Sequence, residues 1–343
     1  MRWAERSGGW AAAGWVAAAW VAAGWMALGM AGTVSPAWAQ SAAPDAVLDR
    51  VLRDPRIQES SGLAVSRRHD GVLWTHNDSG DDAHLYAIGP DGSTLATVTL
   101  AGLDPRDWEA MASSIDSDGT PLLWVGDIGD NYGTRNNGIL VHRIAEPSEL
   151  QNTEVQPTSY RLRYPGPPVD AESLLVDPRD GRLFVITKAP VGGTVYAAPP
   201  VLDPTGANLL ESLGDSPDFL TDGAFAADGR MVVRGYGAMW AGSPAAGWSG
   251  PVSLPPSDQG ESLAVSGDGT AGYVGSEGTR SEIWRVPLPA ALSADVPPGF
   301  TDDQTPDPAK AYGSGLAVPL LAGGFTVMLG LVLLLVRGRR SRS

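Results

Sequence analysis

Residues 109–131 read EAMASSIDSDGTPLLWVGDIGDN, and this stretch decides the fold because its plan recurs along the chain. An acidic residue is followed by a short apolar run, a tight Asp-Gly turn and a second apolar run that ends in polar residues. Asp-Gly between two apolar runs is a strong hairpin signal, because glycine readily takes the positive φ that such turns require. The unit occurs five times, in residues 59–80, 109–131, 172–188, 222–236 and 261–278.

Further apolar runs follow each hairpin and complete a four-stranded unit. Third strands are expected at residues 84–88, 139–144, 194–198, 238–242 and 282–286, and fourth strands at 94–100, 159–164, 208–213 and 250–254. Short antiparallel strands in a repeated unit, with Gly-rich turns and no helical pattern, predict an all-β fold of the β-propeller type. A two-sheet sandwich would explain many strands but not a five-fold repeat.

The number of blades follows from the junctions between a fourth strand and the next acidic start. There are five such junctions, and the first is made by AVLDRVL, residues 46–52. We therefore expect five blades, with the N-terminal strand completing the last blade so that the ring has no free sheet edge. Six blades remain an alternative, because the interval from residue 109 to residue 172 is long.

The two ends of the chain read as targeting and membrane segments. Residues 1–39 are expected to be a signal peptide, with a basic start, a long Ala/Trp/Val stretch and an Ala-Trp-Ala cleavage site; an uncleaved anchor is the alternative. Residues 315–336 are 22 residues without a charge, followed by an Arg-rich tail at 337–343. This pattern predicts a single transmembrane helix with a cytoplasmic tail, so that the propeller (40–292) and a Pro/Asp/Ala-rich stalk (293–313) lie outside the cell membrane.

The charge of the extracellular part is strongly negative. Of the 24 Lys and Arg residues, six lie outside residues 40–312, and of the 39 Asp and Glu residues only Glu5 does, which leaves a net charge of −20 on this part. Such a surface repels nucleic acid and favours hard divalent cations. The chain has no cysteine, which excludes disulfides and thiolate chemistry.

The repeat predicts a polar ring. In a propeller the first strand of each blade lines the channel and the second runs antiparallel to it, so the start of the first and the end of the second share one face. The five starts are Glu59, Glu109, Glu172, Asp222 and Glu261, and the ends carry His76, Asn77, Asp78, Asp127, Asp130, Asn131, Thr187, Lys188, Arg234, Tyr236, Ser276 and Glu277. Each acid alone could be a solvated strand start or a loop cap, whereas five at one point of five repeats indicate a site.

Clustered carboxylates need a cation, a shared proton or basic partners. We expect Ca²⁺ as the cofactor, because it takes six to eight oxygen ligands. The candidate metal ligands are Glu59, Glu109, Asp127, Asp130, Glu172 and Glu261, and the candidate ligand-binding residues are Asn77, Asp78, Asn131 and Tyr236. Zinc is not expected, since there is no cysteine and the four histidines show no paired spacing.

The ordered series HNDSG (76–80), DWEAMA (107–112), DIGDN (127–131), AES (171–173), ITK (186–188) and RGY (234–236) resembles a family of uncharacterised secreted bacterial β-propellers of the WD40/NHL-like kind. The resemblance covers residues 55–285 and implies a propeller without a settled activity. A fainter similarity is to esterase-like and phytase-like propellers, whose acidic phosphatase signature cannot be matched here residue by residue.

Two functions are compatible with this sequence. In the first, a membrane-tethered cell-surface propeller binds an unknown small-molecule or surface ligand at an acidic, Ca²⁺-binding channel mouth. In the second, the protein is a metal-dependent hydrolase of phosphate or carboxylic esters. The candidate catalytic residues are then Glu109 at the metal, Lys188 and Arg234 as anion clamps, and Glu277 or His76 as the general base. A glycosidase using two of the glutamates is a further variant.

Overall fold

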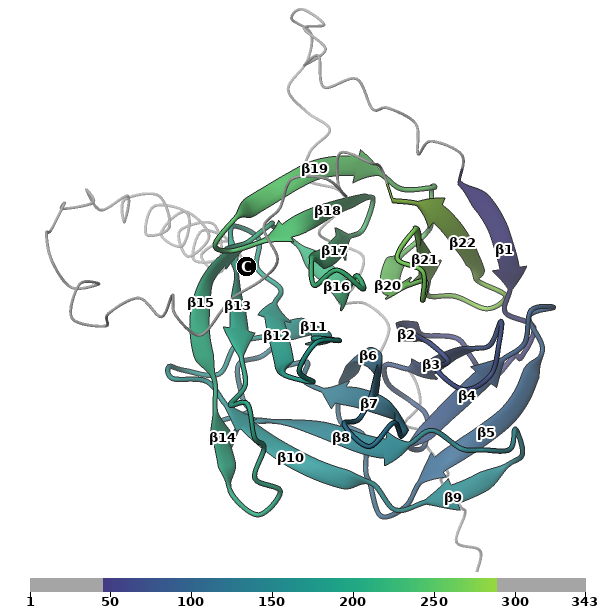
Figure 1. Cartoon of the computed structure of the whole chain (residues 1–343), viewed down its shortest axis with the longest axis horizontal. Coiled ribbons are helices and arrows are strands. Elements are labelled where there is room, and N and C mark those ends of the chain that lie inside the picture. The colour runs from purple at the N-terminus through teal and green to yellow at the C-terminus, as the bar shows by residue number, and fades with distance from the viewer. Residues whose placement is uncertain (1–45, 289–343) are drawn as a thin grey trace, which may run out of the picture. The chain divides into compact units, whose positions relative to one another are not determined.

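The computed structural model describes residues 46–288, which form a five-bladed β-propeller (Figure 1). Each blade is one sheet, and five inner strands, β2, β6, β11, β16 and β20, surround the central channel (Figure 1). In the order of the chain, blade 1 contains β2 (Ser60–Val65), β3 (Leu73–Asn77), β4 (His84–Ile88) and β5 (Thr94–Leu100), and blade 2 contains β6 (Trp108–Ile115), β7 (Pro121–Asp127), β8 (Ile139–Ala145) and β10 (Thr158–Arg163).

The remaining three blades follow the same order from the channel outward. Blade 3 contains β11 (Ala171–Val176), β12 (Leu183–Thr187), β13 (Gly193–Ala197) and β15 (Glu211–Ser216), and blade 4 contains β16 (Leu220–Phe225), β17 (Met231–Gly235), β18 (Ala238–Ser243) and β19 (Gly247–Ser253). Blade 5 contains β20 (Gly260–Val265), β21 (Ala271–Ser276) and β22 (Glu282–Pro287), and its outer strand is β1 (Val47–Val51).

The ring closes as the repeat predicts. β1 pairs antiparallel with β22, with Val47 opposite Arg285, so the N-terminal strand completes the last blade. Five blades are thus confirmed, and the six-bladed alternative is wrong. The long interval between residues 109 and 172 contains an additional strand, β9 (Thr153–Val155). This strand lies between β8 and β10 in the sequence, but it pairs in parallel with β5 of blade 1.

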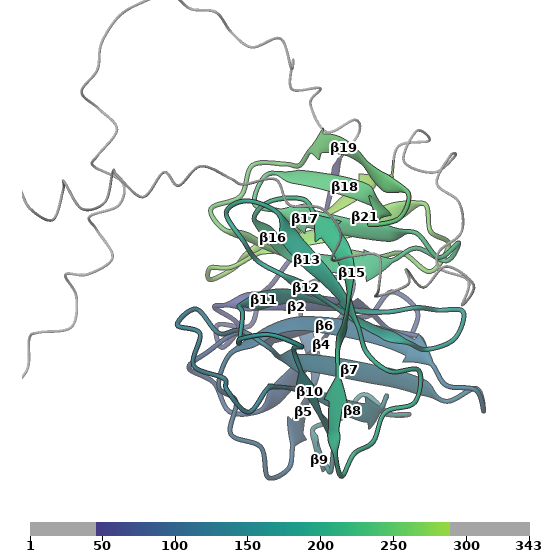
Figure 2. The ribbon, with the colours of Figure 1, turned by 90° about the vertical axis from the view of Figure 1, so that its left-hand side faces the viewer.

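One predicted fourth strand is divided between two blades. The run at residues 208–213 was expected to be a single strand, but Leu210 separates β14 (Ala207–Leu209) from β15. β14 pairs in parallel with β10 of blade 2, whereas β15 pairs with β13 of blade 3. Figure 2 shows the ring from its side, with β15 facing the viewer between blade 4 above and blade 2 below. β9 and β14 therefore cover the outer edges of two blades and hide backbone groups that would otherwise be free to pair.

The five Asp-Gly turns explain why the hairpins form. Gly71, Gly119, Gly181, Gly229 and Gly269 all have positive φ, between 67° and 87°, which costs glycine little and other residues more. The apolar faces of neighbouring blades then pack together, and one buried cluster lies at each blade-to-blade interface; at the interface of blades 3 and 4, for example, Leu175 and Phe184 pack with Leu220 and Val233. This packing fixes the inner strands relative to each other.

Among residues 46–288, no helix is long and apolar enough to cross a membrane. The predicted signal peptide, stalk, transmembrane helix and cytoplasmic tail lie outside the described residues, so these segments stay predictions.

Candidate functional site

The acidic starts of the repeat lie at one end of the channel, which we call the mouth. Glu109, Glu172 and Glu261 are each the second residue of an inner strand, and Glu59 directly precedes β2. All five inner strands have a register irregularity within their first four residues, for example between Trp108 and Ala110 in β6. A bulge changes the direction of a side chain, so the same local irregularity recurs beside the acidic residue at the start of each blade.

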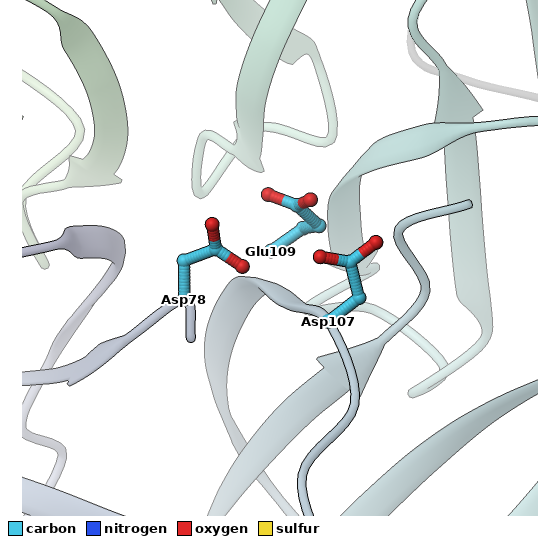
Figure 3. A group of neighbouring side chains, drawn as sticks. All are labelled: Asp78, Asp107 and Glu109. Carbon is cyan, nitrogen blue, oxygen red and sulfur yellow. The ribbon is translucent and has the colours of Figure 1, made fainter. Parts of the chain in front are cut away.

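Five carboxylates form a tight group in the mouth, which we call the carboxylate cluster. One ligand oxygen each of Asp78, Asp107 and Glu109 lie within 4.8 Å of one another, and the same holds for Glu109, Asp170 and Glu172. Figure 3 shows the first triad, whose side chains point toward one another from the end of β3 and the start of β6. Glu109 belongs to both triads and therefore joins them into one cluster.

Two members of the cluster were missed at the sequence level, although a short signal was present. Asp107 and Asp170 stand two residues before Glu109 and Glu172, in the matching tripeptides Asp-Trp-Glu and Asp-Ala-Glu. Residues two apart in a strand lie on the same face, so each tripeptide presents a pair of carboxylates. Blades 2 and 3 are neighbours, and the two pairs therefore meet.

The residues around the cluster neutralise only part of its charge. Burial, together with the charges of Glu172 and Asp78, raises the pKa of Glu109 to about 11. Burial and the charge of Asp107 raise the pKa of Asp78 to about 8. The pKa of Glu172 rises to about 7 through burial, although the charge of Lys188 opposes this rise. Without a bound cation the cluster therefore holds protons at neutral pH.

The DIGDN loop closes one side of the cluster. The N–H of Asp130 donates to Asp170 Oδ1 at 2.7 Å, and the N–H of Gly129 donates to the carbonyl of Asp107 at 3.2 Å. A Cβ at position 129 would lie 2.5 Å from Asp107 Oδ2 and would also contact Glu109 Oε1. The absence of a side chain at Gly129 thus keeps a space beside these two carboxylates, and the donor set around that space suits a hard cation.

Asp127 and Asp130, two predicted metal ligands, lie outside both triads. Asp127 Oδ1 accepts a hydrogen bond from Arg135 Nη2 at 2.5 Å and another from the N–H of Asp107 at 3.1 Å. Asp130 accepts from the N–H groups of Thr134 and Arg135 at 2.7 and 2.8 Å. Both carboxylates therefore hold the shape of the loop, and Asn131 next to them is exposed.

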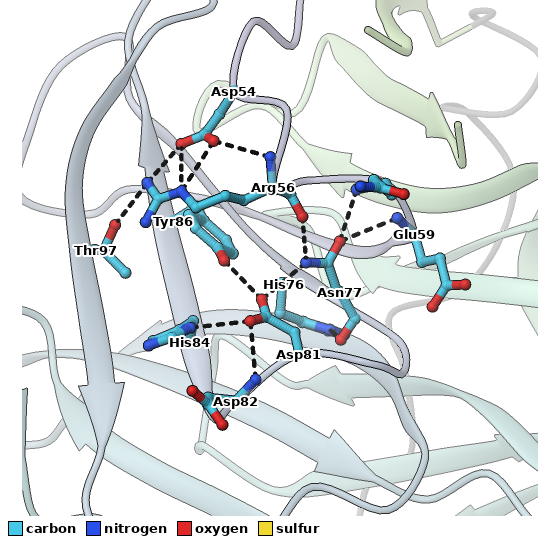
Figure 4. A network of polar contacts seen from close by, with 11 residues as sticks. Asp54, Arg56, Glu59, His76, Asn77, Asp81, Asp82, His84, Tyr86 and Thr97 are labelled. Atoms are coloured by element: carbon cyan, nitrogen blue, oxygen red, sulfur yellow. Dashed lines mark hydrogen bonds and ion pairs between the residues drawn. The ribbon is translucent and has the colours of Figure 1, made fainter. Parts of the chain in front are cut away.

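In the HNDSG loop, Asn77, the residue before Asp78, is held by several hydrogen bonds (Figure 4). Asn77 Oδ1 accepts from the N–H groups of Gln58 and Glu59 at 2.9 and 3.0 Å, and its Nδ2 donates to Asp81 Oδ2 at 2.8 Å. Asp81 also accepts from the hydroxyl of Tyr86 at 2.6 Å. Asn77, predicted to bind a ligand, thus ties the start of β2 to the end of β3, and Asp78 follows it directly.

His76, a predicted general base, is fully buried behind the mouth. Its Nδ1 lies 3.0 Å from the carbonyl oxygen of Asn77, and its ring packs edge-on against Trp108 with the centroids 5.6 Å apart. Burial lowers the pKa of His76 to about 4, so the ring is neutral at physiological pH. These contacts describe a core histidine that supports β6.

Lys188 places a positive charge at the rim of the mouth. Lys188 Nζ donates to Glu172 Oε1 at 2.8 Å and lies 5.3 Å from the centre of the Tyr236 ring. Burial alone would lower the pKa of Lys188, but the charge of Glu172 raises it overall, so Lys188 stays protonated.

Arg234 is fully buried and bonds only backbone atoms among its described partners. Its guanidinium donates to the carbonyls of Gly235, Tyr236, Ser262 and Gly275 at 2.8–3.2 Å. It therefore ties blade 4 to blade 5, which leaves it poorly placed to clamp an external anion.

The remaining predicted residues lie on the blade 4 to blade 1 side. Asp222 is fully buried and accepts from the N–H groups of Gly223 and Leu263 at 2.7 and 2.6 Å, which joins blades 4 and 5. Glu261 is buried with Oε2 unpaired among the described residues. Burial and the charges of Glu261 and Glu59 raise the pKa of the half-buried Glu277 to about 7.

Comparisons with known proteins return similar solved structures but no sequence relative. No protein-family model matches the chain, and no curated protein matches it. A gluconolactonase from Xanthomonas campestris is 13% identical, with a TM-score of 0.43, over 72% of this chain and 91% of that one. A virginiamycin B lyase from Staphylococcus aureus is 15% identical, with a TM-score of 0.37, over 71% and 73% of the two chains. A putative gluconolactonase is 16% identical, with a TM-score of 0.38, over 71% and 91%.

Proposed function

We propose that the propeller binds a divalent cation, Ca²⁺, at the carboxylate cluster and uses the loaded mouth to bind an oxygen-rich ligand. The observation that carries this proposal is the position of Glu109, whose buried carboxylate is shared by two triads. Five carboxylates within one cluster repel one another unless protons or cations balance them. A hard cation with six to eight oxygen ligands meets that need better than Lys188 alone.

The ion would be held by Asp78, Asp107, Glu109, Asp170 and Glu172. A bound Ca²⁺ supplies positive charge and sites for further oxygen ligands. Lys188 adds a second positive charge at the rim, beside Glu172. An acidic propeller can therefore present a locally positive point, and a carboxylate, phosphate or polyol oxygen is the chemistry that it would bind.

A calcium titration tests this proposal directly. The full chain is stripped with EDTA and titrated with Ca²⁺ in a calorimeter, as the wild type and as Glu109→Gln. We expect a single high-affinity event in the wild type and a loss of at least about tenfold in affinity, about 1.4 kcal/mol, in Glu109→Gln. Glu154→Gln, which changes an exposed glutamate on β9, is the matched control and should bind as the wild type does. Equal binding by all three proteins would overturn the proposal.

A metal-dependent hydrolase is the second candidate, and Glu277 favours it. A half-buried carboxylate with a pKa of about 7 is suited to accept a proton at neutral pH. Lys188 would orient an anionic group at the same rim. Hydrolysis of p-nitrophenyl phosphate and p-nitrophenyl acetate is measured with Ca²⁺ and with EDTA. Ca²⁺-dependent turnover that disappears in Glu277→Gln supports this candidate, and no turnover of either ester leaves binding as the function.

We also propose that the propeller is displayed on the outside of the cell membrane by the segment at residues 315–336. The uncharged length of this segment and the four arginines after it support the proposal. Proteolysis of intact cells tests the topology: the propeller should be released into the medium, while a tag at the C-terminus should stay protected. Protection of both ends, or release of both, would contradict it.

A further inference from the structure

Beside the mouth lies an aromatic pocket that the sequence did not reveal. The ring pocket, as we call it, has a volume of about 740 Å³ and is lined by Pro217, Asp218, Phe219, Gly235, Tyr236, Gly237, Ala238 and Trp240. Its side chains come from the ends of β15 and β17 and from the start of β18. Pockets of a few hundred Å³ with aromatic walls and few polar groups are typical of small-molecule sites.

Two of its aromatic rings are unusually exposed. Phe219 is 47% exposed and Tyr236 is 43% exposed, whereas most other aromatic residues within 46–288 are buried or partly buried. When a ligand covers large apolar side chains at a concave surface, their apolar area is removed from water, which is favourable. The exposed rings of Phe219 and Tyr236 therefore provide an apolar surface against which the ring of a ligand would bind favourably.

The backbone of Phe219 is held in a costly conformation. Its φ is +50°, which is in the left-handed region that non-glycine residues seldom adopt. Its N–H donates to the carbonyl of Ala189 at 2.9 Å, and its own carbonyl lies so close to Gly235 that a Cβ there would be 2.8 Å away. Such strain persists where the surrounding structure imposes it and is found frequently at ligand sites.

The ring pocket lies next to Lys188 of the mouth. Phe219 is bonded to Ala189, the neighbour of Lys188, and Asp218 Oδ1 accepts from the N–H of Gly192 in the same loop at 2.6 Å. Lys188 Nζ lies 5.3 Å from the centre of the Tyr236 ring and 2.8 Å from Glu172 Oε1. One ammonium group therefore stands between the carboxylate cluster and the aromatic wall.

We propose that the ring pocket binds the flat apolar ring of a ligand whose oxyanion lies at Lys188 and at the cation of the mouth; this inference rests on the proposed function. The ligand class is aromatic carboxylates or phosphates. A sugar ring would require hydrogen-bond partners on several sides, whereas the walls of the ring pocket are mostly apolar. A cationic ring is disfavoured, because Lys188 already occupies the position over Tyr236.

Benzoate, acetate and glucuronate are the probes, since they present one carboxylate on an aromatic ring, a methyl group and a sugar ring. Calorimetric titrations use the full chain saturated with Ca²⁺. We expect benzoate to bind about tenfold more tightly than acetate, because the pocket removes the apolar surface of the benzoate ring from water. Glucuronate should show no such advantage. Equal affinity for benzoate and acetate, or tighter binding of glucuronate than of benzoate, would overturn the inference.

Two variants locate the effect in the ring pocket. In Phe219→Gly, which also relieves the positive φ and so should fold well, and in Tyr236→Ala, the ratio of benzoate to acetate affinity should fall to about one. Tyr132→Ala removes an aromatic ring that is 91% exposed in the loop after β7, and its ratio should equal that of the wild type. A ratio that is unchanged in Phe219→Gly and Tyr236→Ala contradicts the assignment to this pocket.

Calcium binding is measured in a separate titration, so that the proposed metal site and the ring pocket are tested independently of each other. If Ca²⁺ binds and benzoate has no advantage, the ring pocket inference is wrong while the metal site stands. If Ca²⁺ does not bind, the proposed function is wrong, and phenol, which carries no carboxylate, decides the pocket. Phenol binding that is lost in Phe219→Gly supports the pocket, and no phenol binding by the wild type overturns it.

Discussion

Gly129 lies against Glu109: a methyl group in place of the glycine hydrogen would contact Oε1 of the buried glutamate. The two residues come from the loop after β7 and from the neighbouring inner strand β6. The φ of Gly129 is not in the left-handed region, so its backbone conformation does not require glycine. The glycine is needed because a side chain at this position would occupy the space beside Glu109.

Gly129→Ala should weaken Ca²⁺ binding by at least about tenfold, because the added methyl group displaces Glu109 or Asp107 from the cluster. Calorimetric titration of the EDTA-treated protein measures the change. Gly166→Ala is the matched control, since a Cβ at that exposed glycine meets no atom within 4 Å. Unchanged affinity in Gly129→Ala would mean that the ion, if bound, lies elsewhere.

The raised pKa values predict how the stability of the metal-free protein depends on pH. In the folded protein, burial raises the pKa of Asp78 from its usual 3.8 to about 8 and that of Glu172 from its usual 4.5 to about 7. The folded state therefore binds more protons than the unfolded state between about pH 4 and pH 8. The stability from these groups is complete below that window and is lost as the pH rises through it. In EDTA, the melting temperature should be at least roughly 5 °C lower at pH 8.5 than at pH 5.5.

Calcium should reverse this trend, because the ion replaces the protons. The increase in melting temperature on adding Ca²⁺ should be large at pH 8.5 and should vanish near pH 4.5, where protons occupy the carboxylates. Titrations in two buffers with different ionisation enthalpies should show release of protons on binding at pH 7. An increase that is the same at both pH values would argue against binding at the carboxylate cluster.

The Lys188–Glu172 pair predicts a coupled change in stability. Lys188→Met leaves the buried carboxylate of Glu172 without its ammonium partner, and the free energy of unfolding should fall by about 2–3 kcal/mol. Adding Glu172→Gln should recover most of this loss, since the unpaired charge is then gone. Urea denaturation in EDTA measures both variants. Arg53→Met breaks an exposed pair with Asp91, whose nearest atoms are 3.7 Å apart, and should not change stability measurably. Additive effects of the two mutations would contradict the coupling.

Arg234 should prove to be a stabilising residue that binds no ligand. Arg234→Met removes the donors of four carbonyl groups in the interior, and the free energy of unfolding should fall by about 3–5 kcal/mol. Arg163→Met, on the exposed face of β10, should unfold as the wild type does. At a temperature where both variants are folded, their affinities for acetate, which has no ring to fill the pocket, should match that of the wild type. Full stability with lost acetate binding would instead support an anion clamp.

Most of the fold could be predicted because its signals are local. The Asp-Gly turns, such as Asp118-Gly119, fix hairpins within a few residues, and the repeat sets the number of blades. The pairing of β1 with β22 followed from the need to close the ring. The exchange of β9 and β14 onto neighbouring blades could not be read from the sequence, because it depends on which sheet edge lies nearest in space.

The candidate site, like the fold, could be predicted from the sequence only in part. The sequence by itself determined that Glu109 and Glu172 stand at equivalent points of two repeats, and hence at one end of the channel. Only the tertiary structure decided which acids join the carboxylate cluster: the loop folds so that Arg135 and backbone N–H groups bond Asp127 and Asp130, while Asp107 and Asp170 lie beside Glu109. The physical reason is that a strand start is specified by its own residues, whereas the bonding of a loop carboxylate depends on groups that only the closed ring brings within hydrogen-bond distance.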